Sequence, residues 1–71
     1  MPAPHPVAVR IHDRVLQLVG TAMMKAEMAE TLERLGRHDE VAATHVELRA
    51  ALDDTVTELR AIMIDLKNQA A

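Results

Sequence analysis

A polar cluster near the N-terminus contains the side chains best suited to chemistry. His12 carries an imidazole, which can act as a nucleophile, an acid or a base near neutral pH, and Asp13 places a carboxylate beside it. Gln17 follows Asp13 by four residues, so on a helix the two side chains lie on one face. Arg10 and Arg14 add cations within one helical turn of Asp13. Arginines on a helix are most often solvated, and contact with a phosphate is the alternative for these two. The cluster is therefore suited to nucleophilic or acid–base chemistry at His12.

The remaining histidines do not extend this cluster into a metal site. No two of His5, His12, His38 and His45 have the spacing of ligands on one helical turn. The chain has no cysteine, which excludes thiolate zinc sites as well as disulfides. We therefore predict no metal ligands. A lone histidine on a helix is most often only a solvated or packed side chain, and for His12 that reading is the alternative. His45 is interpreted as a core-edge side chain of the second helix, His38 as part of the turn and His5 as part of the leader.

Two long helices are expected to position the cluster. All three prolines precede residue 7, and each favours extended backbone at the residue before it. Gly36 is suited to the left-handed C-terminal cap of a first helix, and Asp39 to the N-cap of a second. The predicted organisation is a flexible leader (residues 1–6), a helical hairpin (7–68, with helices over 7–35 and 40–67 and a turn at 36–39) and a tail (69–71).

Both predicted helices carry wide apolar stripes. The main row of the first helix follows steps of three and four residues: Ile11, Val15, Leu18, Ala22, Ala26, Ala29 and Leu32. The second helix has two heptad rows: Val41, Leu48, Thr55 and Ile62 on one, and His45, Leu52, Leu59 and Leu66 on the other. Its acidic residues, Glu58 and Asp65 among them, are expected on a solvated face. Stripes of this width require more than one neighbouring helix.

The size and composition of the chain predict dimerisation. A chain of 71 residues buries too little surface to be stable without disulfides, a structural metal or a partner chain. Since the chain has no cysteine and no metal-ligand spacing, a partner chain is the remaining possibility. Nearly half of the residues are apolar but none is aromatic, which is typical of aliphatic packing in a helical bundle. We predict an all-α fold in which an antiparallel two-helix hairpin forms a homodimeric four-helix bundle.

The charge pattern argues against nucleic acid and membrane partners. The formal net charge is −3 and the basic residues are scattered, whereas a nucleic-acid site needs a basic stripe or aromatic platforms. The apolar runs are too short for a membrane span, and the N-terminus has prolines where a signal peptide needs a basic and an apolar region. We therefore expect a cytoplasmic protein.

The string RIHDRVLQ, residues 10–17, resembles the phosphoacceptor motif H-D-x-x-x-Q of one branch of bacterial sensor histidine kinases. This branch includes the nitrate sensors and the membrane-fluidity sensors. The strings ELR at residues 47–49 and ELRAIMIDL at residues 58–66 are similar to that family's second helix. The resemblance is to the dimerisation and phosphoacceptor domain and covers nearly the whole chain after the leader. Val9 stands where the family usually has an arginine, and Arg10 follows it.

The resemblance implies a role for each residue of the cluster. His12 would accept a phosphoryl group and pass it to an aspartate on a response-regulator receiver domain. Asp13 would act as the base that orients the imidazole, and Gln17 would position water for dephosphorylation of the regulator. The function implied is dimerisation and histidine phosphotransfer in two-component signalling.

The ATP-binding domain of such kinases has no counterpart in this chain, which has only two glycines and lacks glycine-rich boxes. We expect no bound cofactor, and ATP would be supplied through a separate kinase domain in cis or in trans. The expected partners are a second copy, a receiver domain and that kinase domain. Two alternatives remain open: a non-catalytic dimerisation or docking module, and a stand-alone response-regulator phosphatase that uses Asp13 and Gln17.

Overall fold

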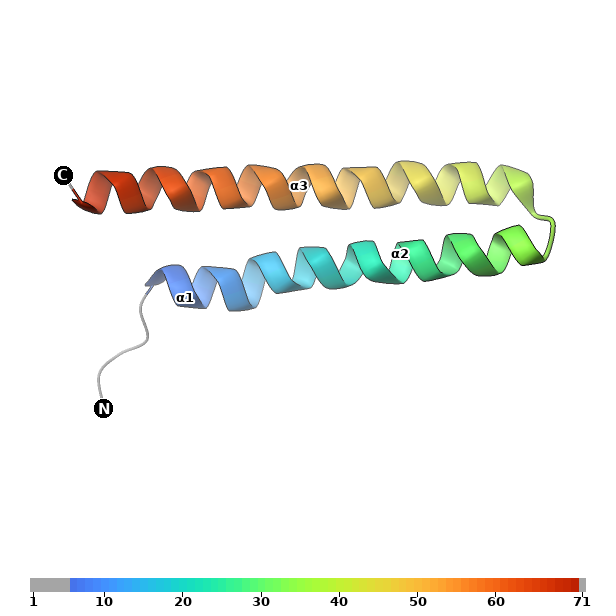
Figure 1. Ribbon diagram of the computed structural model, residues 1–71, viewed down its shortest axis with the longest axis horizontal. Helices are drawn as coiled ribbons and strands as arrows, with labels where there is room; N and C mark the ends of the chain where they lie inside the picture. The colour runs from blue at the N-terminus through green and yellow to red at the C-terminus, as the bar shows by residue number, and fades with distance from the viewer. Residues whose placement is uncertain (1–5, 71) are drawn as a thin grey trace.

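The computed structural model describes residues 6–70 of the chain, and its regular structure is entirely helical (Figure 1). The first helical rod consists of α1 (Pro6–Arg10), a π-helical turn η1 (Ile11–Val15) and α2 (Leu16–Arg34). The second is one long helix, α3 (His38–Ala70). No strand occurs in this part of the chain, which confirms the all-α prediction.

The outer ends of the two rods extend beyond the predicted limits. Pro6, assigned to the leader, is the first residue of α1, a position where the missing N–H of proline is no disadvantage. α3 continues past Lys67 to Ala70, because no residue between them breaks a helix. The rest of the predicted leader, residues 1–5, and the last residue of the predicted tail, Ala71, lie outside the described residues.

The first rod ends in a glycine cap, as predicted. Gly36 has a φ of 71°, in the left-handed region. Its N–H donates to the carbonyl of Glu33 at 3.1 Å, and the N–H of Arg37 donates to the carbonyl of Leu32 at 3.0 Å. This pair of hydrogen bonds is the Schellman motif, which satisfies carbonyls that the end of a helix leaves unpaired.

The second rod begins at His38, earlier than predicted, and Asp39 is not its N-cap. The carbonyl of Arg37 accepts hydrogen bonds from the N–H groups of Glu40 and Val41, both at 3.1 Å. Nη2 of Arg37 also donates to Oε1 of Glu40 at 2.6 Å. Asp39 lies instead within the first turn of α3, where its charge complements the helix dipole. Arg37 both closes the Schellman motif of the first rod and caps α3. The turn is therefore shorter than the predicted 36–39.

Replacing Gly36 with alanine should lower the free energy of unfolding by about 1 kcal/mol, because a Cβ is strained at positive φ. Gly20 is the matched control: it lies within α2, and a Cβ added there meets no atom within 4 Å. Gly20→Ala should therefore be neutral or raise stability by up to about 1 kcal/mol. Chemical denaturation followed by circular dichroism measures both changes, and equal effects would contradict the assigned cap.

The two rods lie side by side and run in opposite directions (Figure 1), with α2 in contact with α3. Their shared interface is narrow and formed by small or medium side chains: Val15, Ala22, Ala29, Thr44, Ala51, Thr55 and Ile62. The two buried threonines donate to backbone carbonyls four residues earlier, Thr44 to Glu40 and Thr55 to Ala51, each at 2.8 Å. These bonds explain how hydroxyl groups are accommodated on an apolar seam.

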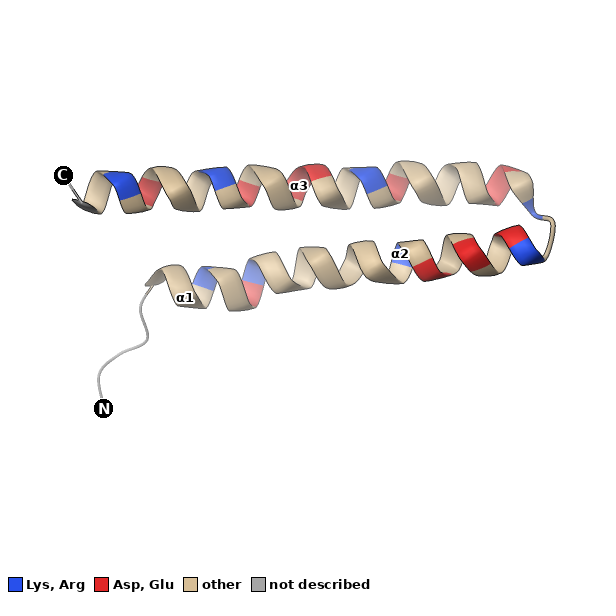
Figure 2. Cartoon of the chain, viewed as in Figure 1, with Lys and Arg blue, Asp and Glu red and all other residues tan. Residues whose placement is uncertain are grey.

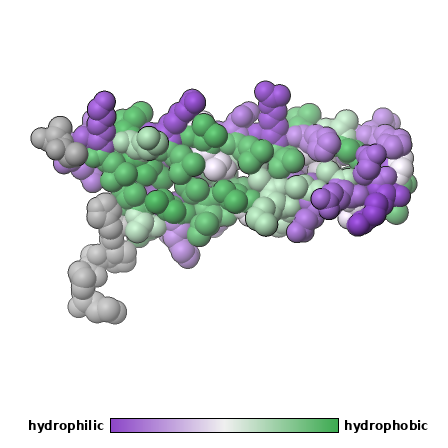
Figure 3. Space-filling view, in the orientation of Figure 1, coloured by the Kyte–Doolittle hydropathy of each residue, from purple (hydrophilic) through white to green (hydrophobic). Residues whose placement is uncertain are grey.

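Of the two heptad rows on α3, only one is covered by α2. Thr55 and Ile62 of the first row are buried. In the second row, Leu52, Leu59 and Leu66 remain 40–48% exposed. Figure 3 shows apolar surface spreading across both rods, while polar side chains gather at the turn. No helix in residues 6–70 combines the length and apolar character of a membrane span.

Candidate functional site

His12 and Asp13 both lie in the π-helical turn η1, and the structure brings their side chains into direct contact. Nδ1 of His12 lies 2.9 Å from Oδ1 of Asp13. The two side chains remain 80% and 67% exposed, respectively. Since Nδ1 faces the carboxylate, the other ring nitrogen, Nε2, is the one left for a reaction with a ligand. The predicted pairing of imidazole and carboxylate is therefore present in the geometry.

The π-helical turn was not predicted, and it changes which residue faces α3. The N–H of Leu16 donates to the carbonyl of Ile11, five residues back instead of the usual four. In an uninterrupted α-helix Ile11 would lie one turn before buried Val15 and pack against α3. The structure instead leaves Ile11 41% exposed, so its predicted place in the main apolar row is wrong. Arg10, one residue earlier, takes that place.

Arg10 bridges two carboxylates of α3. Its Nε and Nη2 donate to Oε1 of Glu58 at 3.3 and 3.2 Å, and its Nη1 donates to Oδ2 of Asp65. The hydrogen bond to Asp65, with a smaller contribution from Glu58, raises the pKa of Arg10 above its ordinary value. Glu58 and Asp65 were expected only to face solvent. Their separation of seven residues, two helical turns, is the sequence signal that could have paired them with one arginine.

The other predicted site residues lie nearby but make fewer contacts. Gln17 is exposed at the start of α2, and within residues 6–70 its side chain forms no hydrogen bond with His12 or Asp13. Arg14 is exposed and makes no ion pair in this part of the chain. Of the two arginines considered as phosphate contacts, Arg10 is paired with carboxylates of α3, and Arg14 is exposed.

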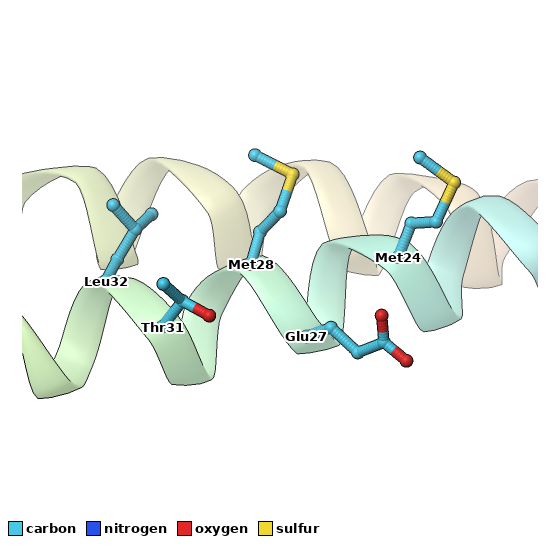
Figure 4. Close-up of a pocket in the computed structure, with 5 residues that line it drawn as sticks. All are labelled: Met24, Glu27, Met28, Thr31 and Leu32. Carbon is cyan, nitrogen blue, oxygen red and sulfur yellow. The ribbon is translucent and has the colours of Figure 1, made fainter.

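A shallow apolar groove follows α2 away from the cluster. One hollow of about 650 Å³ begins at Gln17, and a second of about 400 Å³ follows it to Leu32. Met24 and Glu27 line both. Figure 4 shows Met24, Met28 and Leu32 in a row with their side chains pointing the same way, while Glu27 points away from them.

The rod between the cluster and the middle of α2 carries no charge. Residues 15–24 include no Lys, Arg, Asp or Glu, and Figure 2 shows a tan stretch of the first rod between its charged ends. Lys25 then forms an ion pair with Glu47 of α3, with Nζ 2.7 Å from Oε2. In the described residues, no three side chains of the kinds that ligate metals gather at one place.

Comparison with known proteins gives no relative for this chain: no family model, no curated protein and no solved structure matches it.

Proposed function

We propose that this chain is a dimerisation and histidine phosphotransfer domain of a cytoplasmic two-component signalling system, with His12 as the phosphoacceptor. The observation that carries this proposal is the contact between Nδ1 of His12 and Oδ1 of Asp13 at 2.9 Å, on an imidazole that is 80% exposed. A nucleophilic histidine needs one nitrogen held by a carboxylate and the other open to its substrate, and this pair has both features.

The reaction consists of two displacements at phosphorus. The lone pair of Nε2 on His12 attacks the γ-phosphorus of ATP, the P–O bond to ADP breaks, and ADP leaves with that electron pair. Asp13 accepts the hydrogen bond from Nδ1–H and stabilises the positive charge that develops on the ring. A carboxylate oxygen of a receiver aspartate then attacks the phosphorus, and the P–N bond breaks to return its electron pair to Nε2. Arg14, which is exposed, contacts the phosphoryl group.

Gln17 and the groove beyond it form the contact with the receiver. The groove begins at Gln17 and continues past Met24 and Met28, so a receiver seated there has its aspartate near the cluster. Methionine side chains are flexible and adapt to a partner surface. From this position the Gln17 amide orients water toward a phosphorylated receiver, which is the basis of a second function as a regulator phosphatase.

The chain works as a homodimer. The exposed second row of α3 and the exposed Leu16 on the first rod are apolar surface that an isolated hairpin leaves in water. A second copy related by a two-fold axis covers this surface and completes a four-helix bundle. ATP is held by a separate kinase domain, supplied in cis or in trans.

One experiment tests the proposal and separates it from its rivals. The protein is mixed with ATP and a separate histidine-kinase ATP-binding domain, and with a phosphorylated receiver domain, as wild type, His12→Gln and Gln17→Ala. Phosphotransfer predicts an acid-labile label on wild type and Gln17→Ala that is absent from His12→Gln. Regulator dephosphorylation that survives His12→Gln but is lost in Gln17→Ala identifies a phosphatase. If both variants match wild type in every assay, the chain is a docking module and the proposal is wrong.

A further inference from the structure

Arg10 ties the end of α1 to α3 immediately before the turn that carries His12. Its guanidinium donates through three nitrogens to two carboxylates, with Glu58 reached at 3.2 and 3.3 Å and Asp65 by Nη1. The side chains of Arg10 and Glu58 are only 33% and 23% exposed, so this pair is partly shielded from water, whereas Asp65 is half-exposed. The guanidinium donors of Arg10 are used by the carboxylates of α3, so they are not available to contact a phosphate.

The bridge lies immediately before the π-helical turn in the first rod. Val15 is buried against α3 at 7% exposure and anchors one end of the turn. The hydrogen bond in η1 reaches back five residues instead of four, which places Arg10 about one turn before Val15. In an α-helix, Ile11 would take that place and face α3. In the structure Arg10 contacts α3 and Ile11 is 41% exposed. The two helical registers are alternatives.

His12 and Asp13 lie inside the segment that distinguishes these registers. Conversion of η1 to α-helix would turn both side chains relative to α3, and also relative to Gln17 on the following turn. An Ile11 side chain on the core side would favour the α-helical register, because apolar burial is favourable. The ion pairs of Arg10 with Glu58 and Asp65 oppose this preference.

We propose that Arg10 is a positioning residue for His12: by bridging Glu58 and Asp65 it holds the segment Ile11–Val15 in the π-helical register and so sets the direction of the His12–Asp13 pair. This role rests on the proposed phosphotransfer function. It differs from phosphate binding by Arg10, because it requires the two carboxylates of α3 as much as it requires the arginine.

The test compares two ways of breaking the bridge. Arg10→Gln removes the guanidinium, and the double variant Glu58→Gln/Asp65→Asn leaves Arg10 in place without its acceptors. Lys25→Gln is the matched control, since it removes the ion pair to Glu47, which also joins the rods but lies away from η1. Phosphoramidate, a small donor that needs no ATP-binding domain, phosphorylates histidine with release of ammonia, and phosphorus NMR follows the phosphohistidine formed.

We expect Arg10→Gln and the double variant to lower the phosphorylation rate of His12 by about ten- to a hundredfold, the scale on which misplacement of a reacting group acts. Lys25→Gln should stay within twofold of wild type. A second readout is the scalar coupling across the hydrogen bond of the Leu16 N–H. This coupling should join Leu16 to the Ile11 carbonyl in wild type and Lys25→Gln, and to the His12 carbonyl in both bridge variants.

The positioning role would be overturned if His12 were phosphorylated at the wild-type rate in the double variant but slowly in Arg10→Gln. That result would show that Arg10 acts on the phosphoryl group directly. An unchanged coupling to Ile11 in both bridge variants would overturn it as well. The coupling does not depend on phosphorylation. If wild type forms no phosphohistidine at residue 12, the proposed function fails, while the coupling still decides whether the bridge sets the register.

Discussion

Replacing Asp13 with asparagine is expected to lower the rate of His12 phosphorylation by about 10²–10⁴-fold, the range that a positioned acid–base partner contributes. The carboxylate lies 2.9 Å from Nδ1 of His12, where it fixes the ring with its proton on that nitrogen. An asparagine in the same position can donate as well as accept a hydrogen bond, so it no longer selects this tautomer. It also carries no charge to offset the cation that forms as Nε2 attacks phosphorus.

The measurement is the initial rate of label incorporation from ATP and a separate ATP-binding domain, at saturating concentrations of both. Asp53→Asn is the matched control, because Asp53 is an exposed acid on α3 that makes no ion pair in the described part of the chain. It removes the same charge without touching the site and should leave the rate unchanged. A rate within twofold of wild type for Asp13→Asn would contradict the assigned role of the carboxylate.

Replacing Leu59 with aspartate is expected to weaken the proposed homodimer by about 10⁴-fold or more. Leu59 lies in the row of α3 that α2 leaves 40–48% exposed, and a second hairpin would enclose it. An unpaired charge buried in a core costs about 3 kcal/mol or more, and two-fold symmetry places two copies in the same bundle. The combined cost of about 6 kcal/mol corresponds to this change in the dissociation constant.

Val46→Asp is the control for this variant. Val46 is 71% exposed and lies two residues from buried Thr44, hence about 200° around the helix and away from α2. Sedimentation or light scattering at micromolar concentration should give a dimer for wild type and Val46→Asp, and a monomer with lowered helix content for Leu59→Asp. A monomeric wild type, or equal masses for the two variants, would exclude the four-helix bundle.

The helices and their connection could be predicted from local sequence. The absence of helix breakers over long stretches defines both rods, and Gly36 ends the first because only glycine takes positive φ at little cost. His12 and Asp13 are adjacent in the chain, so their contact could be expected from the sequence alone. In the structure, Nδ1 of His12 lies 2.9 Å from Oδ1 of Asp13. These features involve residues close in the chain, so propensity and spacing were sufficient.

The register of the segment that carries the site was decided by tertiary contacts. Periodicity assumes 3.6 residues in every turn, and on that assumption Ile11 packs against α3 and Arg10 faces outward. The carboxylates of Glu58 and Asp65, 48 and 55 residues away, attract Arg10 to the core side, and the π-helical turn absorbs the extra residue. A local pattern contains no information about such a distant partner. The His12–Asp13 contact therefore follows from adjacent residues, whereas the direction in which this pair faces depends on the packing of the second helix.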